Sequence, residues 1–582
     1  MKILKKANVF NIPAGEPFMD NLLSLLKENN PEDMLDTIIF LPTNRAVRIL
    51  SQKFGEISAN SYNLPNPKIF SFNDINNDDT IISILNTQKL SGYLKDFFVD
   101  EKPPIDEFSR ILIISELIKN QSHKLGKHYS TLHSIIQAKE FIDLIDYFFN
   151  SGASLNSLKI LKNDDLADHQ LEILNFLENI ASRWEELLDR LEIADFTLQT
   201  SRRLNKIAKI LKENNYNKPI IAAGSTGTLP STRNLLETIA YLPKGKLVLP
   251  GLVNTIEEYV WKKIDECHPQ YGLKILLKEI NVNKDKVRNL KSLSNAKNSH
   301  STFVNEAMNP PLAIHKWHEL LKKYDSKFIK NSLRNFSLIE CKNEDEEANT
   351  IAIIIRKELS EKNQNIRFVT ADHYLSRRVS SILKRWKINI NDSFGTPFHL
   401  TQTGLIWNMI AHTALNNFKP TDLLALLKHP LCYLGMQKKT VLEATYLLEK
   451  KILRNSYYLQ DIQILKNLLS DNNPDFLSLE KKQKDLLLKL FSAIENNFLP
   501  FIKIQNKQNV YCKELLKIHQ SIAEKITTNP NCLLSKERKL YMGSEGEKLK
   551  ETLRLIKNSL DYLGKIKPEE WIEISQNLMQ DI

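Results

Sequence analysis

The chain has 582 residues, with 80 Lys and Arg residues against 69 Asp and Glu residues and a net charge of +11. This length predicts about three to five domains, each with its own core, and excludes a disordered tail and a small disulfide-stapled peptide. Only 16 residues are Gly, well below the usual ~7%, which favours a mostly helical protein. The basic excess is spread over a long chain, so it favours an anionic partner only modestly.

The five cysteines are far apart in the sequence and form no CxxC pair. This spacing predicts neither a disulfide framework nor a Cys-rich metal or iron–sulfur site, and it favours a reducing compartment. The basic N-terminal segment reaches Asn11 and Pro13 before an apolar stretch develops, so we expect no signal peptide. No apolar run approaches the ~18 residues of a membrane span. We therefore expect a cytoplasmic protein with no membrane partner.

Residues 1–75 alternate between strand-like and helical patterns. Short apolar runs at 9–12 and 37–41 each end at a Pro, and helical patterns follow at 18–27 and 45–54. This repeated order of strand, turn and helix is typical of a parallel α/β unit.

Residues 76–215 carry apolar residues at three- and four-residue spacing, which predicts a block of helices. Strands return at 219–223 and 246–249, with a helix predicted between them at 232–240. The helical block is therefore predicted to be an insertion inside one α/β domain.

A second set of strand and helix patterns begins after residue 330. Apolar runs at 335–339 and 366–370 predict strands, and the patterns at 344–359 and 373–386 predict the helices that follow them. We expect, in chain order, the first half of an α/β domain, a helical insertion, the second half of that domain, a second α/β domain and a helical domain. Their predicted bounds are 1–75, 76–215, 216–330, 331–430 and 431–582.

The phosphate loop of nucleotide motors, G-x-x-x-x-G-K-[ST], does not occur in the sequence. Where the first predicted strand ends, Glu16 brings a negative charge and Pro17 lacks the N–H that a phosphate needs. The strand at 219–223 leads into Gly-Ser-Thr, where a magnesium-binding carboxylate is required. We therefore expect no ATP hydrolysis by this chain and no cofactor.

A metal-dependent nuclease needs two carboxylates that converge on a metal, with a Lys beside the attacked phosphate. Glu340 and Lys342 follow a predicted strand, but no strand is predicted for the nearest preceding carboxylate, Asp325. A second coincidence at 475–482 lies in a helical stretch. The sequence therefore favours neither a catalytic site nor a metal site, and a nuclease that uses Glu340 and Lys342 is kept as an alternative.

A better candidate for binding follows the second predicted strand. Thr43 stands at the start of a helix, and Arg45 and Arg48 lie in its first turns. A helix N-terminus with a hydroxyl group and arginines can hold a nucleic-acid phosphate. The alternative is an ordinary Thr N-cap beside solvated arginines.

The second α/β set repeats this pattern, with Thr370 after a predicted strand and Arg377 and Arg378 in the following helix. Two such turns, one in each α/β set, favour a track along a DNA strand. The turn that contains Thr226 could hold an anion, although a tight strand-to-helix turn explains it as well. The candidate DNA contacts are therefore Thr43, Arg45, Arg48, Thr226, Thr370, Arg377 and Arg378.

At these same segments the chain resembles the AddB subunit of the AddAB helicase–nucleases, in the form found in alphaproteobacteria. The matching segments occur in the family's order over most of residues 8–455. They are VFNIPAGEPF at 9–18, FLPTNRAVR at 40–48, IAAGSTGTLP at 221–230, LVLPG at 247–251, HPQYGL at 268–273, FVTAD at 368–372 with the Arg pair at 377–378, NDSFGTP at 391–397 and LLALLKHPL at 423–431.

The resemblance implies an α/β fold with two superfamily 1 helicase-like parallel-sheet domains, whose P-loop-like motor is degenerate, and large helical insertions. It also implies a role in processing double-strand DNA breaks for recombination, beside an AddA-like helicase subunit in a heterodimer. Thr43, Arg45 and Arg48 match a helicase motif after the second strand and are implied to contact the DNA strand.

The sequence departs from the family because it has no credible nuclease motif and no cluster-forming cysteines. We therefore expect it to correspond to the N-terminal part of an AddB protein, and we carry no nuclease activity over. The expected function is a non-catalytic DNA-binding subunit. The alternative is a scaffold or decayed remnant that docks on a partner helicase without binding DNA.

Overall fold

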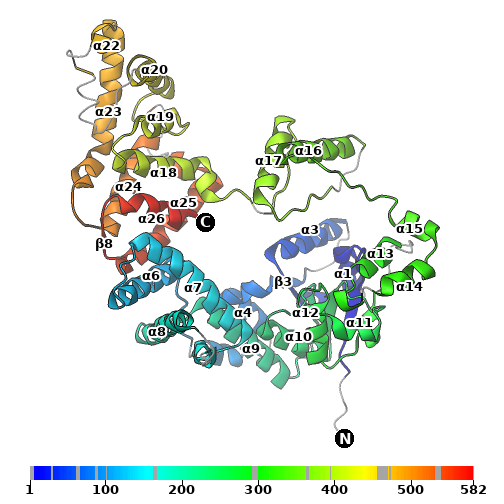
Figure 1. Cartoon of the computed structure of the whole chain (residues 1–582). Coiled ribbons are helices and arrows are strands. Elements are labelled where there is room, and N and C mark those ends of the chain that lie inside the picture. Colours follow the sequence, from blue (N-terminus) through cyan, green and yellow to red (C-terminus); the bar gives the residue numbers. More distant parts are fainter. Residues whose placement is uncertain are drawn as a thin grey trace. The chain divides into compact units, whose positions relative to one another are not determined.

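The computed structural model forms two compact units, each described here by itself (Figure 1). The sheet unit contains Met1–Ile105 and Ile142–Ser337, and the helical unit contains Asp106–Phe141 and Leu338–Ile582. The described residues are 6–27, 31–60, 66–85, 90–99, 101–161, 167–290, 299–313, 315–361, 366–393, 395–454, 469–470, 474–530 and 539–580.

The sheet unit is built on six parallel strands in the order β3-β2-β4-β5-β1-β6. Their bounds are β1 Val9–Ile12, β2 Ile38–Leu41, β3 Lys68–Ser71, β4 Ile220–Ala223, β5 Gly245–Pro250 and β6 Arg288–Asn289. In the central strands β2 and β4 every side chain is buried, as expected for a parallel sheet that is covered on both faces. The strands predicted at 9–12, 37–41, 219–223 and 246–249 are confirmed.

Two apolar clusters cover the two faces of this sheet. Alternate residues of a strand point to opposite faces, so Ile38 and Phe40 belong to one cluster whereas Ile39 and Leu41 belong to the other. Helices α1 (Phe18–Lys27) and α3 (Asn44–Asn60) pack on the second face, and α9 (Phe196–Glu213), α10 (Pro230–Tyr241) and α12 (Tyr271–Glu279) pack on the first. The sheet unit is thus a three-layer α/β structure, and the α/β part of the prediction is confirmed.

The predicted insertion at 76–215 is helical where the structure describes it, but it is shared between the two units. Its helices are α4 Asp78–Leu85, α5 Tyr93–Phe98, α6 Glu107–Lys124, α7 Thr131–Ser151, α8 Asp168–Arg190 and α9. Helix α6 and the first half of α7 belong to the helical unit. The other helices of the sheet unit are α2 Pro31–Leu35, α11 Glu258–Lys263, α13 Ser299–Ala307, α14 Lys316–Lys323 and α15 Ser326–Ser332.

The helical unit packs around α18 (Gln402–Leu415), whose Trp407 is fully buried. The His519 ring stacks on Trp407 at 3.9 Å between centroids, and it hydrogen bonds to the Trp407 carbonyl and the Trp571 indole N–H. The helices here are α16 Glu344–Ser360, α17 His373–Arg385, α19 Pro420–Lys428, α20 Lys438–Leu448, α22 Pro474–Leu477, α23 Lys481–Gln505, α24 Cys512–Thr527, α25 Gly543–Ser559 and α26 Glu570–Gln580. Strands β7 (Val510–Tyr511) and β8 (Lys565–Ile566) pair antiparallel.

The prediction of strands at 335–339 and 366–370 is wrong. The described residues there form no strand, and Leu338 and Val369 are each 89% exposed. A strand requires a hydrogen-bonded neighbour, and these segments have none among the described residues. The second parallel sheet is therefore not formed in this part of the chain, where α16 and α17 pack on each other around a small apolar cluster instead.

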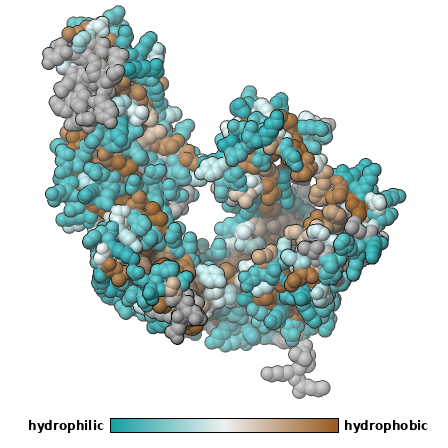
Figure 2. All heavy atoms as spheres, in the orientation of Figure 1, coloured by the Kyte–Doolittle hydropathy of each residue, from teal (hydrophilic) through white to brown (hydrophobic). Residues whose placement is uncertain are grey.

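The surface of both units is largely hydrophilic on the face drawn in Figure 2, with scattered apolar side chains. No helix within the described residues is both long enough and apolar enough to cross a membrane.

Candidate nucleic-acid interface at the sheet edge

The turns that follow β1, β2, β4 and β5 meet at the carboxyl edge of the sheet. A Cβ atom placed on Gly224, after β4, would lie 3.4 Å from the Phe18 ring and 3.6 Å from Pro42. After β5, the Gly251 N–H donates to the Ile12 carbonyl at 2.8 Å. Both glycines have positive φ, +80° and +68°, so the tight turns need them. Ligands of open parallel sheets bind at this edge.

Thr43 is the N-cap of α3. Its Oγ1 accepts a hydrogen bond from the Ala46 N–H at 3.2 Å, and its carbonyl accepts one from the Val47 N–H at 3.1 Å. The structural explanation for Thr43, an ordinary cap, therefore holds. Because a hydroxyl also carries a donor proton and Thr43 is exposed, its O–H is still available to a ligand.

Arg45 and Arg48 are exposed on the first two turns of α3. Within the described part of the chain, neither guanidinium forms a hydrogen bond or an ion pair, and the first turn of α3 has no acidic residue. The next ion pair along the helix, between Lys53 and Asp20 at 2.6 Å, fixes α3 to α1. The N-terminal part of α3 therefore presents two uncompensated positive charges and the positive end of the helix dipole.

Thr226 has a packing role in its turn. The turn is closed by a hydrogen bond from the Gly227 N–H to Ser225 Oγ at 3.2 Å and by one from Arg233 to the Gly227 carbonyl at 3.3 Å. Thr226 is half-buried against α12, where a Cβ atom on Gly272 would lie 3.3 Å from its own Cβ. This arrangement favours the tight-turn interpretation over an anion site.

The residues predicted around α17 lie in the helical unit and are engaged differently. Asp372 is the N-cap of α17, and Thr370 Oγ1 accepts the Asp372 N–H at 3.0 Å. Arg378 forms ion pairs with Glu344 at 3.1 Å and Asp345 at 2.5 Å in the first turn of α16.

Arg377 is exposed, and its guanidinium lies 5.1 Å from the centroid of the Tyr374 ring. Of Arg377 and Arg378, Arg377 is therefore the one that forms no ion pair among the described residues. Because the two sets belong to different units, the continuous DNA track across them stays a prediction.

The residues of the nuclease alternative are divided between the two units. Asp325 caps α15 through the Phe328 N–H at 2.8 Å and lies in the sheet unit, whereas Glu340 and Lys342 lie in the helical unit. Among the described residues, no group of three or more His, Cys, Asp or Glu side chains could hold a metal ion.

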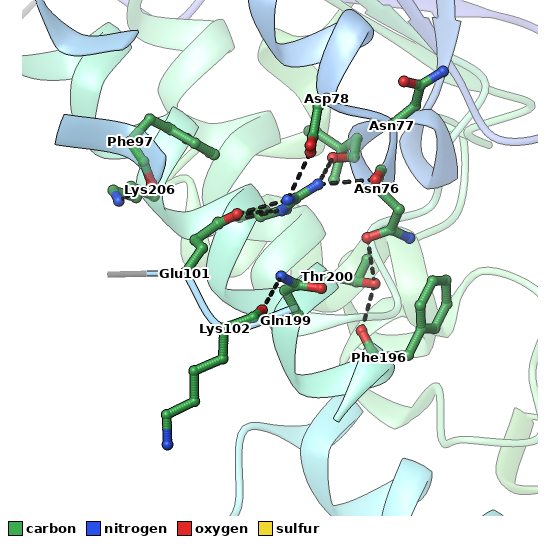
Figure 3. A network of polar contacts seen from close by, with 12 residues as sticks. Asn76, Asn77, Asp78, Phe97, Glu101, Lys102, Phe196, Gln199, Thr200 and Lys206 are labelled. Carbon is green, nitrogen blue, oxygen red and sulfur yellow. Dashed lines mark hydrogen bonds and ion pairs between the residues drawn. The ribbon is translucent and has the colours of Figure 1, made fainter. Parts of the chain in front are cut away.

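A buried polar network that was not predicted from the sequence includes Asn76, Asp78 and Glu101 (Figure 3). Arg203, whose side chain is 5% exposed, lies at its centre. Its guanidinium pairs with Glu101 at 2.6 Å and Asp78 at 2.8 Å, and donates to the carbonyls of Ile75 and Asn76 at 3.2 and 2.9 Å. These bonds tie α9 to the segment that follows β3. The sequence feature that could have predicted this network is the position of Arg203 on the apolar face of α9, beside Leu204 and Ile207.

A scan against protein-family models finds no match for this chain, and a search of curated proteins finds no significant match.

Proposed function

We propose that the chain is a non-catalytic, helicase-like DNA-binding subunit, or part of one, that acts in the repair of double-strand breaks by recombination. The observation that carries the proposal is the pair of uncompensated arginines, Arg45 and Arg48, at the N-terminus of α3. They follow β2 at the carboxyl edge of a parallel sheet, where bound ligands are expected. Guanidinium groups and helix N-termini are common contacts to nucleic-acid phosphates.

The proposed lack of ATP hydrolysis is supported by the turn after β1. Pro13 and Pro17 have no N–H, and the N–H of Glu16 already donates to the Pro13 carbonyl at 3.2 Å. A phosphate cradle needs several free backbone N–H groups and positive charge, whereas Glu16 adds a negative charge.

The role in break repair and the pairing with an AddA-like helicase are supported by the resemblance of eight sequence segments to AddB proteins. The three-layer α/β structure, with its parallel sheet, is compatible with a helicase-like domain. Because the turn after β1 does not favour ATP hydrolysis by this chain, a helicase partner of this kind would supply the ATP-driven unwinding.

The test is fluorescence anisotropy of the full chain with labelled single-stranded DNA and with blunt duplex DNA, over a series of salt concentrations. We expect binding that weakens steeply with salt and depends little on base sequence, because phosphate contacts release counterions and carry no base information. Absence of binding at low salt would contradict the proposal and favour the scaffold alternative.

A further inference from the structure

The sheet unit contains a cavity of about 420 Å³ in its helical part. It lies between α8, α9 and the segment that begins at Glu101, and all of its lining residues belong to the sheet unit. Its volume falls within the range of about 300–1,000 Å³ that small-molecule sites occupy. No part of the proposed DNA-binding function uses it.

The cavity is built by two helices and a fixed turn. Helix α8 presents Glu185, Leu188 and Asp189, which share one helix face because they are three and four residues apart. Helix α9 presents Leu198 and Arg202 at the same spacing. The turn between the helices is held by hydrogen bonds from the Ile105 N–H to the Ala194 carbonyl and from the Ala194 N–H to the Pro103 carbonyl, both at 2.9 Å.

Several charged groups of the lining are already satisfied. Glu101 is paired with Arg203. Figure 3 shows Lys206 close to Phe97, whose ring centroid lies 4.7 Å from the ammonium. Lys102 pairs with Asp189 at 2.8 Å, and this partner lowers the pKa of the Asp189 carboxyl. These groups form the walls of the cavity, and each has its own counterion or acceptor.

Two opposite charges remain. Within the described residues, neither Glu185 nor Arg202 forms a hydrogen bond or an ion pair, although both line the cavity. They do not pair with each other, and Arg202 lies near enough to Asp189 to help lower the pKa of that carboxyl. Burial, together with the nearby Asp189, raises the pKa of the Glu185 carboxyl, and Lys159 acts in the opposite direction. Leu188 and Leu198 add apolar surface to the lining.

We propose that this cavity binds a zwitterion with an apolar body, the chemistry of a free aliphatic amino acid or a short peptide. Its ammonium group pairs with Glu185, its carboxylate pairs with Arg202, and its apolar part lies against Leu188 and Leu198. Charge-assisted hydrogen bonds at both ends fix the orientation. The proposal is independent of DNA binding, so the two can fail separately.

The test is isothermal titration calorimetry of the full chain with L-leucine and with L-leucyl-L-leucine, which separates the amino acid from the peptide. For whichever zwitterion binds, the N-acetyl and C-terminal amide derivatives remove one charge each. We expect saturable 1:1 binding of one zwitterion, and at least about tenfold weaker binding of each derivative, the usual effect of losing one charged hydrogen bond. Absence of saturable heat in the millimolar range would overturn the proposal.

Two variants test which side chain binds the ammonium group and which binds the carboxylate. Glu185→Gln should weaken binding of the zwitterion at least about tenfold, and this variant should bind the zwitterion no more tightly than the N-acetyl derivative. Arg202→Gln should likewise bind the zwitterion no more tightly than the amide derivative. The matched controls are Glu186→Gln and Arg190→Gln, exposed residues of α8 outside the cavity lining, which should bind as the unaltered chain does. Equal binding by Glu185→Gln and Glu186→Gln would contradict the proposed site.

Discussion

The two units place their surface arginines in different surroundings, although the same sequence pattern produces both. On α3 a threonine caps the helix, and Arg45 and Arg48 are exposed without an ion pair among the described residues. On α17 the corresponding Arg378 is held by Glu344 and by Asp345, 33 residues away. The first turn of α16 contains four acidic residues, whereas that of α3 contains none.

This difference shows that a capped helix with nearby arginines does not by itself make an anion site. The cap depends on local sequence, but the availability of the charge depends on which element packs beside the helix. A carboxylate at hydrogen-bond distance from the guanidinium competes with a phosphate for the same donors. The N-terminus of α3 and that of α17 therefore carry the same sequence pattern, but we expect weaker DNA binding at α17, where carboxylates pair with Arg378.

Each unit also buries polar side chains in specific contacts. The sheet unit buries a charged residue, Arg203, and pairs it with carboxylates. The helical unit buries His519, which is 0% exposed, and burial lowers its pKa to about 3. The Trp571 N–H donates to Nδ1, so Nε2 carries the single proton, and the ring is neutral in the folded protein.

One of the two largest effects should come from acid. His519 has a folded pKa of about 3, below the unfolded value of about 6.5, so the unfolded chain binds more protons below about pH 6.5. Stability is therefore complete above about pH 6.5 and decreases as the pH falls, by about 3 kcal/mol at pH 4.5. Burial lowers the pKa of His429 to about 4, which acts in the same direction.

Urea unfolding followed by tryptophan fluorescence at pH 7.5 and pH 4.5 measures this loss. His519→Gln removes the titration but keeps a donor and an acceptor, so its stability should depend less on pH. The same pH dependence in His519→Gln as in the unaltered chain would show that His519 is not the titrating group.

A comparable loss is expected from Arg203→Met in the sheet unit. The substitution leaves Glu101, whose side chain is 17% exposed, without its counterion, and breaking such a pair costs about 3–5 kcal/mol. Urea unfolding should show this decrease, whereas Arg202→Met, at an exposed neighbour on the same helix, should change stability by less than about 0.5 kcal/mol. Equal stability of the two variants would contradict the role assigned to the Arg203 network.

A smaller change can make α3 resemble α16. Asn44→Glu places a carboxylate in the first turn, four residues before Arg48, where the two can pair. We expect single-stranded DNA binding to weaken several-fold, and the dependence of log affinity on log salt to become less steep by about 0.7, the value for one phosphate contact. Fluorescence anisotropy measures both, with Asn44→Gln as the uncharged control. Unchanged binding by Asn44→Glu would place the DNA elsewhere.

The smallest effect is expected from making α16 resemble α3. Glu344→Gln combined with Asp345→Asn frees Arg378, so DNA affinity should rise about two- to fivefold if α17 contacts the strand, since one added phosphate contact is expected. Glu361→Gln combined with Glu443→Gln changes the net charge equally at other exposed positions of the helical unit. If this control raises affinity as much, the gain comes from net charge and not from Arg378.

Much of the sheet unit follows from local sequence. β1, β2, β4 and β5 are short, largely apolar runs that end at Pro or Gly, so their positions could be predicted. β3 and β6 could not, because Lys68–Ser71 mixes polar and apolar residues and Arg288–Asn289 is two residues long. Both form strands only because a neighbouring strand supplies their hydrogen bonds.

The wrong predictions have the same physical origin. The segment 366–370 has the alternation of a strand, with Ile366 and Phe368 packed on the helices and Val369 exposed, but no neighbour pairs with it among the described residues. For the site, the Thr43 cap and the exposure of Arg45 follow from their place on α3. The neutralisation of Arg378 and the packing of Thr226 depend on contacts that sequence spacing does not contain.

The most direct test of the account is the salt dependence of single-stranded DNA binding by the Arg45→Ala/Arg48→Ala double variant of the full chain. The control is Arg190→Ala/Lys209→Ala, which removes the same charge at exposed positions of the same unit. We predict weaker binding and a log affinity versus log salt slope that is less steep by about 1.4, the value for two phosphate contacts, with the control unchanged. The same affinity and slope in both double variants would contradict the assignment of α3 as the DNA contact.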